Sequence, residues 1–132
     1  MTTVEEALVT YLKADTTLKG KISDRIYSQH VPQSSILPCV VYQRISSNRI
    51  LTHDQSSSGL VQAVYQFDIY STTYLSALEI ADALRGALQG YKGTQNGVNI
   101  LAILPRNEIH SEEREIGITR IMIEYNVDYQ EV

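Results

Sequence analysis

The stretch Gly59-Leu-Val-Gln-Ala-Val-Tyr-Gln-Phe-Asp-Ile-Tyr-Ser71, together with the segment that follows it as far as Gly90, decides the fold. Apolar residues recur at every second position of the first part, at Val61, Ala63, Tyr65, Phe67 and Ile69. This alternation, rich in β-branched and aromatic residues, predicts a half-buried strand. The next part changes to a helical period, and its apolar stripe consists of Ala77, Ile80, Ala81, Leu84, Ala87 and Leu88. Each element has one apolar side, so we expect the two to pack on each other.

The ends of this helix are also marked in the sequence. Thr72 or Thr73 can cap its first turn, and Gly90 lies where helices commonly end. A second helix is predicted from Val4 to about Ala14, after a Thr3–Glu6 capping box. We therefore expect two helices, joined to the rest of the chain by the connector 16–24 and the loop 29–38.

The remaining segments predict strands. A short strand is expected at 25–27 and a longer one at 39–45, which Ile50 and Leu51 could extend. Asn96-Gly97 is a strong hairpin signal, and the strand after it is expected to run from Val98 to Leu104 and end at Pro105. The segment 106–117 is charged, and we expect a solvated loop or a twisted hairpin there. The cleanest alternation runs from Ile118 to Gln130.

This order of elements predicts an α+β fold in one domain, residues 1–132. We expect a mainly antiparallel β-sheet with two α-helices packed on one face. Residues 39–71 should form a long β-hairpin whose far end projects from the body, with a solvated, mobile tip at 53–59.

Composition excludes several classes of protein. The 132 residues are 43% hydrophobic, as in a globular domain, and no run approaches the roughly 18 apolar residues of a membrane span. The N-terminus lacks a signal peptide, so we expect no secretion. A single cysteine, Cys39, excludes an internal disulfide. The net charge of −4 argues against a protein that binds nucleic acid by neutralising phosphates.

The sequence contains no recognisable catalytic constellation, so we expect no enzyme, no cofactor and no metal. His30, His53 and His110 all fall in predicted loops. His110 with Glu112 and Glu113 could bind a metal weakly, but a solvated charged loop explains them better. Asp68 and Glu124 could in principle act as an acid/base pair, but pairing with cations on a wetter strand face is the simpler interpretation.

Two places have the composition of a protein interface. Arg49, Ile50 and Leu51 put one basic and two apolar groups near the expected hairpin tip, although a plain disordered tip remains the alternative. Leu75 lies opposite the apolar stripe of its helix. The candidate interface residues are Asn48, Arg49, Ile50, Leu51, Thr52 and Leu75.

Taken in order, the motifs resemble the tail completion proteins of long-tailed bacteriophages, also called tail terminators or head-tail joining proteins. The resemblance covers nearly the whole chain. It rests on Leu8, Tyr11 and Leu12; Arg25-Ile26-Tyr27; Val31-Pro32-Gln33; Leu37-Pro38-Cys39-Val40-Val41-Tyr42-Gln43; Tyr65-Gln66-Phe67-Asp68-Ile69-Tyr70; Tyr74, Ala77 and Ala81; and Gly90-Tyr91-Lys92-Gly93. Cys39 departs from the aromatic or aliphatic residue expected there, and the segment 106–117 matches no family pattern.

The resemblance implies a homo-hexameric ring in the virion, assembled in the host cytoplasm, at the head-proximal end of the tail tube. Its partners would be the tail tube protein and the head completion or connector protein. The genome DNA would pass through the lumen without specific binding, which fits the negative charge of each subunit.

Two other classes stay open on the sequence alone. A small α+β ligand-binding domain or enzyme would need a pocket with convergent polar groups, and the sequence marks none. A DNA-binding protein would need a basic stripe, but the cluster of Lys13, Lys19, Lys21 and Arg25 is diluted by acidic neighbours.

Overall fold

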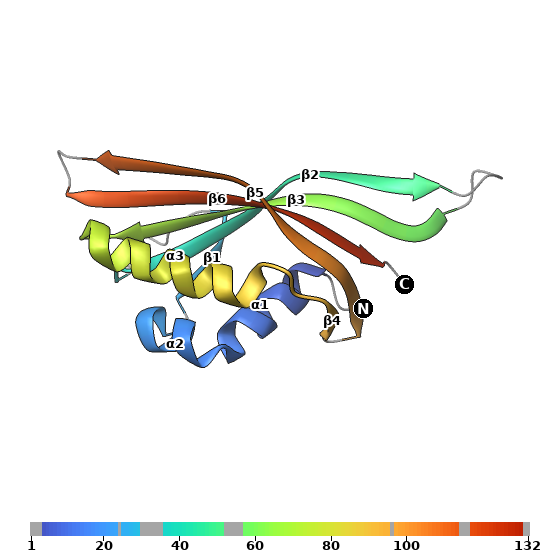
Figure 1. Ribbon diagram of the computed structural model, residues 1–132, viewed down its shortest axis with the longest axis horizontal. Helices are drawn as coiled ribbons and strands as arrows, with labels where there is room; N and C mark the ends of the chain where they lie inside the picture. The colour runs from blue at the N-terminus through green and yellow to red at the C-terminus, as the bar shows by residue number, and fades with distance from the viewer. Residues whose placement is uncertain are drawn as a thin grey trace.

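A computed structural model of the chain describes residues 4–23, 25–29, 36–51, 57–95, 97–113 and 117–130. Within these residues, three helices and six strands form an α+β fold (Figure 1). The elements are α1 (Val4–Ala14), α2 (Thr16–Ile22), β1 (Ile26–Ser28), β2 (Cys39–Leu51), β3 (Ser57–Ser71), α3 (Tyr74–Leu88), β4 (Gly93–Gln95), β5 (Val98–Glu113) and β6 (Ile118–Gln130).

The strands form one sheet in the order β1-β2-β3-β6-β5-β4. The four long strands pair antiparallel with their neighbours, as expected, and so does β4 with β5. β1 instead pairs parallel with β2, through Ile26 and Val40, so the sheet is mixed rather than purely antiparallel.

The core lies between one face of the sheet and the helices (Figure 1). The predicted inward faces of β3 and β6 are confirmed, and the side chains of Tyr65, Phe67 and Tyr125 are fully buried. The α3 stripe meets them, and the side chain of Thr73 caps this helix by accepting a hydrogen bond from the Ser76 amide at 3.2 Å.

A third helix, α2, was not predicted. The connector 16–24 looked non-helical because Gly20 interrupts a segment of only two turns. The helix forms because the Asp15 carboxylate accepts a hydrogen bond from the Leu18 amide at 3.0 Å. Leu18 and Ile22 are both fully buried and hold the helix against the core.

Two strands are longer than predicted. β2 continues from Ile45 to Leu51, with bulges along its ladder with β3. β5 does not end at Pro105 but continues to Glu113, paired with β6 across a bulge at Pro105–Asn107. Proline is tolerated there because β5 is paired on only one side at this point. The twisted-hairpin alternative for 106–117 is thus correct for the described residues 106–113.

The long β2–β3 hairpin is confirmed. Its pairing runs from Cys39–Tyr70 to Leu51–Ser57, and Figure 1 shows its far end extending past the helices. Ser57 to Gly59 belong to β3 rather than to the expected tip, and residues 53–56 lie outside the described residues.

Candidate functional site

The predicted interface residues of the hairpin lie at one end of the molecule. Asn48 and Arg49 are exposed on β2, and Ile50 is half-buried. Leu51 pairs with Ser57 through the backbone, and Thr52 lies outside the described residues. The stretch Asn48–Leu51 is therefore part of the β2–β3 ladder, with a bulge between Arg49 and Leu51, and we call it, with the start of β3, the hairpin arm.

The other predicted interface residue lies elsewhere. Leu75 is 67% exposed in the first turn of α3, beside Tyr74 at 50%. Figure 1 shows that α3 begins at the end of the sheet opposite to the hairpin arm. The structure therefore does not bring Leu75 together with the arm residues but gives two separate surfaces.

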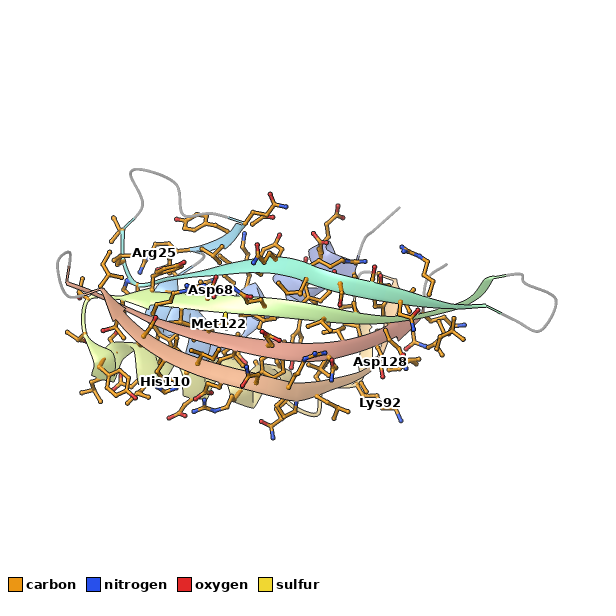
Figure 2. The ribbon with its side chains drawn as sticks, turned by 90° about the horizontal axis from the view of Figure 1, so that it is seen from above. Arg25, Asp68, Lys92, His110, Met122 and Asp128 are labelled. Carbon is orange, nitrogen blue, oxygen red and sulfur yellow. The ribbon has the colours of Figure 1, made fainter. Side chains whose placement is uncertain are left out.

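A third surface is the face of the sheet turned away from the helices, seen from above in Figure 2 and called here the open face. One half of this face carries a polar cluster around Asp68 (Figure 2). The Gln66 amide donates to both Asp68 carboxylate oxygens at 3.1 Å, and the Arg120 guanidinium donates to Asp68 Oδ1 at 3.2 Å. The predicted pairing of Asp68 with a cation is thus confirmed.

Gln66 is buried together with Asp68, so the expectation of a wetter strand face at Asp68 is wrong. They are 8% and 6% exposed, because β3 is a central strand and side chains of β2 and β6 flank them on both sides. Arg120 also lies over the ring of Tyr70, 6.0 Å from its centroid. Glu124 pairs more loosely, with Arg106 at 3.5 Å.

The other half of the open face is a shallow depression of about 350 Å³. Its lining combines hydroxyl and amide groups with few charges, namely Ser46, Asn48, Gln62, Ala63, Val64, Leu104, Arg106, Asn126 and Asp128. These groups come from the four long strands, so only pairing in this register brings them together. Such a surface can accept and donate hydrogen bonds but has no concentration of charge.

A chain of polar contacts that the sequence did not indicate joins α3 to β5. The Tyr74 hydroxyl lies 2.7 Å from His110 Nδ1, and His110 Nε2 lies 2.6 Å from a Glu108 oxygen. Glu108 also pairs with Arg85 at 2.5 Å, and Arg85 contacts Asp82. His110 was expected in a loop, and only the continuation of β5 past Pro105 places it against α3. These side chains are partly exposed and hold the helix to the sheet edge.

A second unpredicted cluster lies on the helix side of the sheet. The Arg44 guanidinium donates to the hydroxyls of Tyr65 at 2.8 Å and Tyr129 at 3.1 Å. Glu5 of α1 completes the cluster, 3.5 Å from Arg44. Burial raises the pKa of the Tyr65 hydroxyl far above its usual value, although Arg44 opposes the shift. The cluster fixes α1 to the sheet and keeps the Tyr65 hydroxyl protonated.

The described residues offer little for chemistry. Among them, no three His, Cys, Asp or Glu side chains come together as metal ligands. Cys39 is fully buried at the start of β2. No helix in this part of the chain is both long and apolar enough to span a membrane.

Comparisons with known proteins point in one direction. A family model described as tail completion protein gp17 matches residues 6–129. Among solved structures, 26 chains match, one of them from the virion of a native gene transfer agent particle. That chain superposes with a TM-score of 0.71 over 96% of this chain and 94% of its own, at 15% identity, which shows a shared fold. No curated protein matches the chain.

Proposed function

Because the chain belongs to the tail completion protein gp17 family, we propose that it closes the head-proximal end of a phage tail tube as a homo-hexameric ring. The family match confirms the resemblance drawn from the motifs and is the observation that carries the proposal. It makes the chain a structural protein of the virion tail rather than an enzyme. In the proposed ring, one face stops the growth of the tube and the other binds the head connector.

A ring of this kind needs contacts between two different patches of each subunit. Such heterologous contacts close when the rotation between neighbours divides the circle evenly. The chain has separate exposed surfaces at its two ends, the hairpin arm and the Tyr74–Leu75 turn of α3, each suited to a different neighbour. We propose that Asn48 to Thr52 and Leu75 contact adjacent subunits, the tail tube protein or the connector.

Passage of DNA sets a further requirement on the ring. Six copies carry about −24, six times the −4 of one chain. A lumen lined by acidic residues would repel phosphates and let the genome move without being held. No covalent chemistry is required, because termination and joining follow from shape.

Deletion of the gene in the producing phage tests this function. We expect tails of irregular length that fail to join heads, measured by negative-stain electron microscopy, and complementation with the intact chain should restore uniform, joined tails. Tails of normal, uniform length attached to heads after deletion would overturn the proposal.

A further inference from the structure

The end of the sheet opposite to the hairpin arm concentrates exposed apolar side chains. Seven large apolar side chains are exposed among the described residues, and four of them lie at this end, namely Ile36 at 69%, Leu75 at 67%, Tyr74 at 50% and Ile109 at 47%. Ile36 lies just before the start of β2, Tyr74 and Leu75 begin α3, and Ile109 lies near the end of β5. Apolar side chains gathered in this way mark a surface that another protein covers.

A shallow depression of about 490 Å³ adjoins this group, and Tyr74 forms part of its wall. It lies where the start of α3 meets β5 and β6 and is lined by Thr72, Tyr74, His110, Ser111 and Thr119. The contact of 2.7 Å between the Tyr74 hydroxyl and His110 joins its two sides. The volume far exceeds the roughly 30 Å³ of one water molecule, so the depression can take side chains of a partner. We call this depression, together with Leu75, the docking end.

The two ends of the sheet also differ in charge. Residues 108–117, at the docking end, contain four glutamates and one arginine, a net charge of −3. Residues 44–67, which form most of the β2–β3 hairpin, contain two arginines and one aspartate, a net charge of +1. The hairpin arm contributes Arg49 to this balance and also carries the half-buried side chains of Ile50 and Leu60. Figure 1 shows the end of the β5–β6 hairpin beside the start of α3, and the hairpin arm at the opposite end of the molecule.

The two ends are therefore complementary in both charge and apolar character. We propose that, within the ring of the proposed function, the hairpin arm of each subunit packs against the docking end of the next copy. Arg49 then lies beside the glutamates of the β5–β6 hairpin, and Ile50 and Leu60 pack against Tyr74 and Leu75. This contact presupposes the proposed function and assigns both surfaces to a second copy of the chain, rather than to the tube protein or the connector. Charge decides which ends meet, whereas apolar packing holds them together, because complete chains of −4 repel one another.

The charge pattern disfavours the other arrangements of two copies. Arm against arm brings two positive ends together, docking end against docking end brings two acidic ends together, and contact between like charges suppresses both pairings. Lys19 and Lys21 make α2 basic as well, but its apolar residues Leu18 and Ile22 are buried. Of these two basic surfaces, the arm is the one that combines positive charge with apolar side chains. A contact between two different ends of the chain repeats head to tail, as a closed ring requires.

Mixing two defective variants tests the contact. Arg49→Glu/Ile50→Ser removes the charge and the apolar group of the arm but leaves the docking end intact, whereas Leu75→Asp does the reverse. Each variant alone should sediment as a monomer under conditions in which the parent forms rings. A one-to-one mixture should sediment as a dimer and no larger, because one intact arm and one intact docking end remain. Circular dichroism of each variant establishes that it folds, and Thr17→Asp on the exposed surface of α2 is the control that should still form rings.

Disulfide trapping provides a second, independent measurement. Asn48→Cys in the arm and Thr72→Cys at the docking end lie far apart within one chain. Asn48 is nine residues from Cys39 along β2, roughly 30 Å, and Thr72 follows Tyr70, the partner of Cys39. A disulfide spans at most roughly 7 Å, so the two thiols can join only between copies. On a non-reducing gel, Asn48→Cys subunits lengthened by a tag should form a mixed dimer with untagged Thr72→Cys subunits, and the double variant should form a ladder that ends at the ring size.

Matched controls and contrary outcomes separate the contact from the function on which it rests. Thr17→Cys in place of Thr72→Cys should give no mixed dimer, and neither should the parent, whose Cys39 is buried. Rings that persist in both defective variants, with no mixed disulfide, would overturn the contact and leave the ring intact. A mixture that stays monomeric although both variants fold would also overturn it, as would disulfides mainly between two identical variants. A ladder that continues into open fibres would support the contact and overturn the closed ring.

Discussion

Phe67 lies in the middle of the core, 1% exposed, with its ring 6.0 Å from that of Tyr125 in an edge-on arrangement. Replacing Phe67 with Ala should lower the free energy of unfolding by about 3–5 kcal/mol, the usual cost of an emptied aromatic site. Urea denaturation of purified subunits measures this, with Leu75→Ala as an exposed control expected within about 0.5 kcal/mol of the parent. A loss below about 1 kcal/mol for Phe67→Ala would mean that the inward face of β3 is wrongly assigned.

The two most buried tyrosines should respond in opposite ways to loss of the hydroxyl. The Tyr65 hydroxyl binds Arg44 and Glu5, whereas the buried Tyr125 hydroxyl has no hydrogen-bond partner among the described residues. Tyr65→Phe should destabilise by about 1.5–3 kcal/mol, because it removes hydrogen bonds to charged groups. Tyr125→Phe should leave stability unchanged or raise it by up to about 1–3 kcal/mol, because it removes an unpaired buried group. If thermal or urea unfolding showed Tyr125→Phe to be less stable than Tyr65→Phe, the hydrogen bonds assigned to Tyr65 and the unpaired hydroxyl assigned to Tyr125 would both be contradicted.

Tyr125 also predicts a loss of stability at alkaline pH. Burial raises the pKa of its hydroxyl to about 12, from 10.0 when unfolded, with Arg85 lowering it and Glu108 raising it less strongly. Between these values the unfolded chain has released the proton and the folded chain still holds it, so stability is full below pH 10 and falls as the pH rises towards 12. The loss attributable to Tyr125 should be about 2–3 kcal/mol. The free energy of unfolding in urea, measured at pH 9 and 11.5 for the parent and for Tyr125→Phe, isolates this loss. An equal change with pH in the two proteins would contradict the raised pKa of Tyr125.

At the scale of the elements, the sequence predicted what periodicity can encode. β6 was predicted with its observed bounds, and α1, α3 and the β2–β3 hairpin follow from uninterrupted patterns. α2 escaped because two turns containing a glycine are too short to establish a period. The continuation of β5 was missed because a proline ends a strand only where the ladder needs a backbone N–H, which proline lacks. The sequence does not show which strands are edges, where no such N–H is needed.

The candidate surfaces were predictable to a smaller extent. Exposure of Leu75 and Arg49 could be inferred, because each breaks the pattern of its own element. The cluster of Tyr74, His110 and Glu108 could not, because it depends on strand register between segments far apart in the sequence. The same holds for the burial of Asp68, which follows from the central position of β3 rather than from its alternation.

The hairpin arm should change its dynamics on assembly. Its backbone is paired between Leu51 and Ser57, but it extends past the helices and has little core beneath it (Figure 1). Local opening should therefore be frequent in an isolated subunit. Hydrogen exchange of the amides from Arg49 to Leu51 should slow at least tenfold in assembled tails, with buried β6 amides near Ile123 as a reference. Equal exchange of the arm in the two states would show that it is not a contact.

The molecule as a whole has a net negative charge, and the long edges of its sheet expose apolar side chains on β2 and β5. Each added subunit brings a further −4 towards the others, so closing a ring works against electrostatic repulsion. Packing of exposed apolar side chains such as Leu75, Ile45 and Leu104 between subunits offsets this repulsion without any attraction between charges. The chain should therefore assemble in spite of its charge rather than because of it.

Assembly should accordingly strengthen with salt. Raising the ionic strength from 0.01 to about 0.15 M shortens the screening length from about 30 Å to about 8 Å, which removes most of the repulsion between subunits. The fraction of ring in sedimentation velocity runs at fixed protein concentration should rise over this range. Leu75→Asp, which adds one more negative charge and removes an exposed apolar group of the proposed subunit contact, should abolish the ring at low salt, whereas Thr17→Asp adds the same charge on α2 and should weaken assembly only slightly. Rings that dissociate as salt is added would instead mean that ion pairs hold the subunits together, and the apolar contact at Leu75 would be wrong.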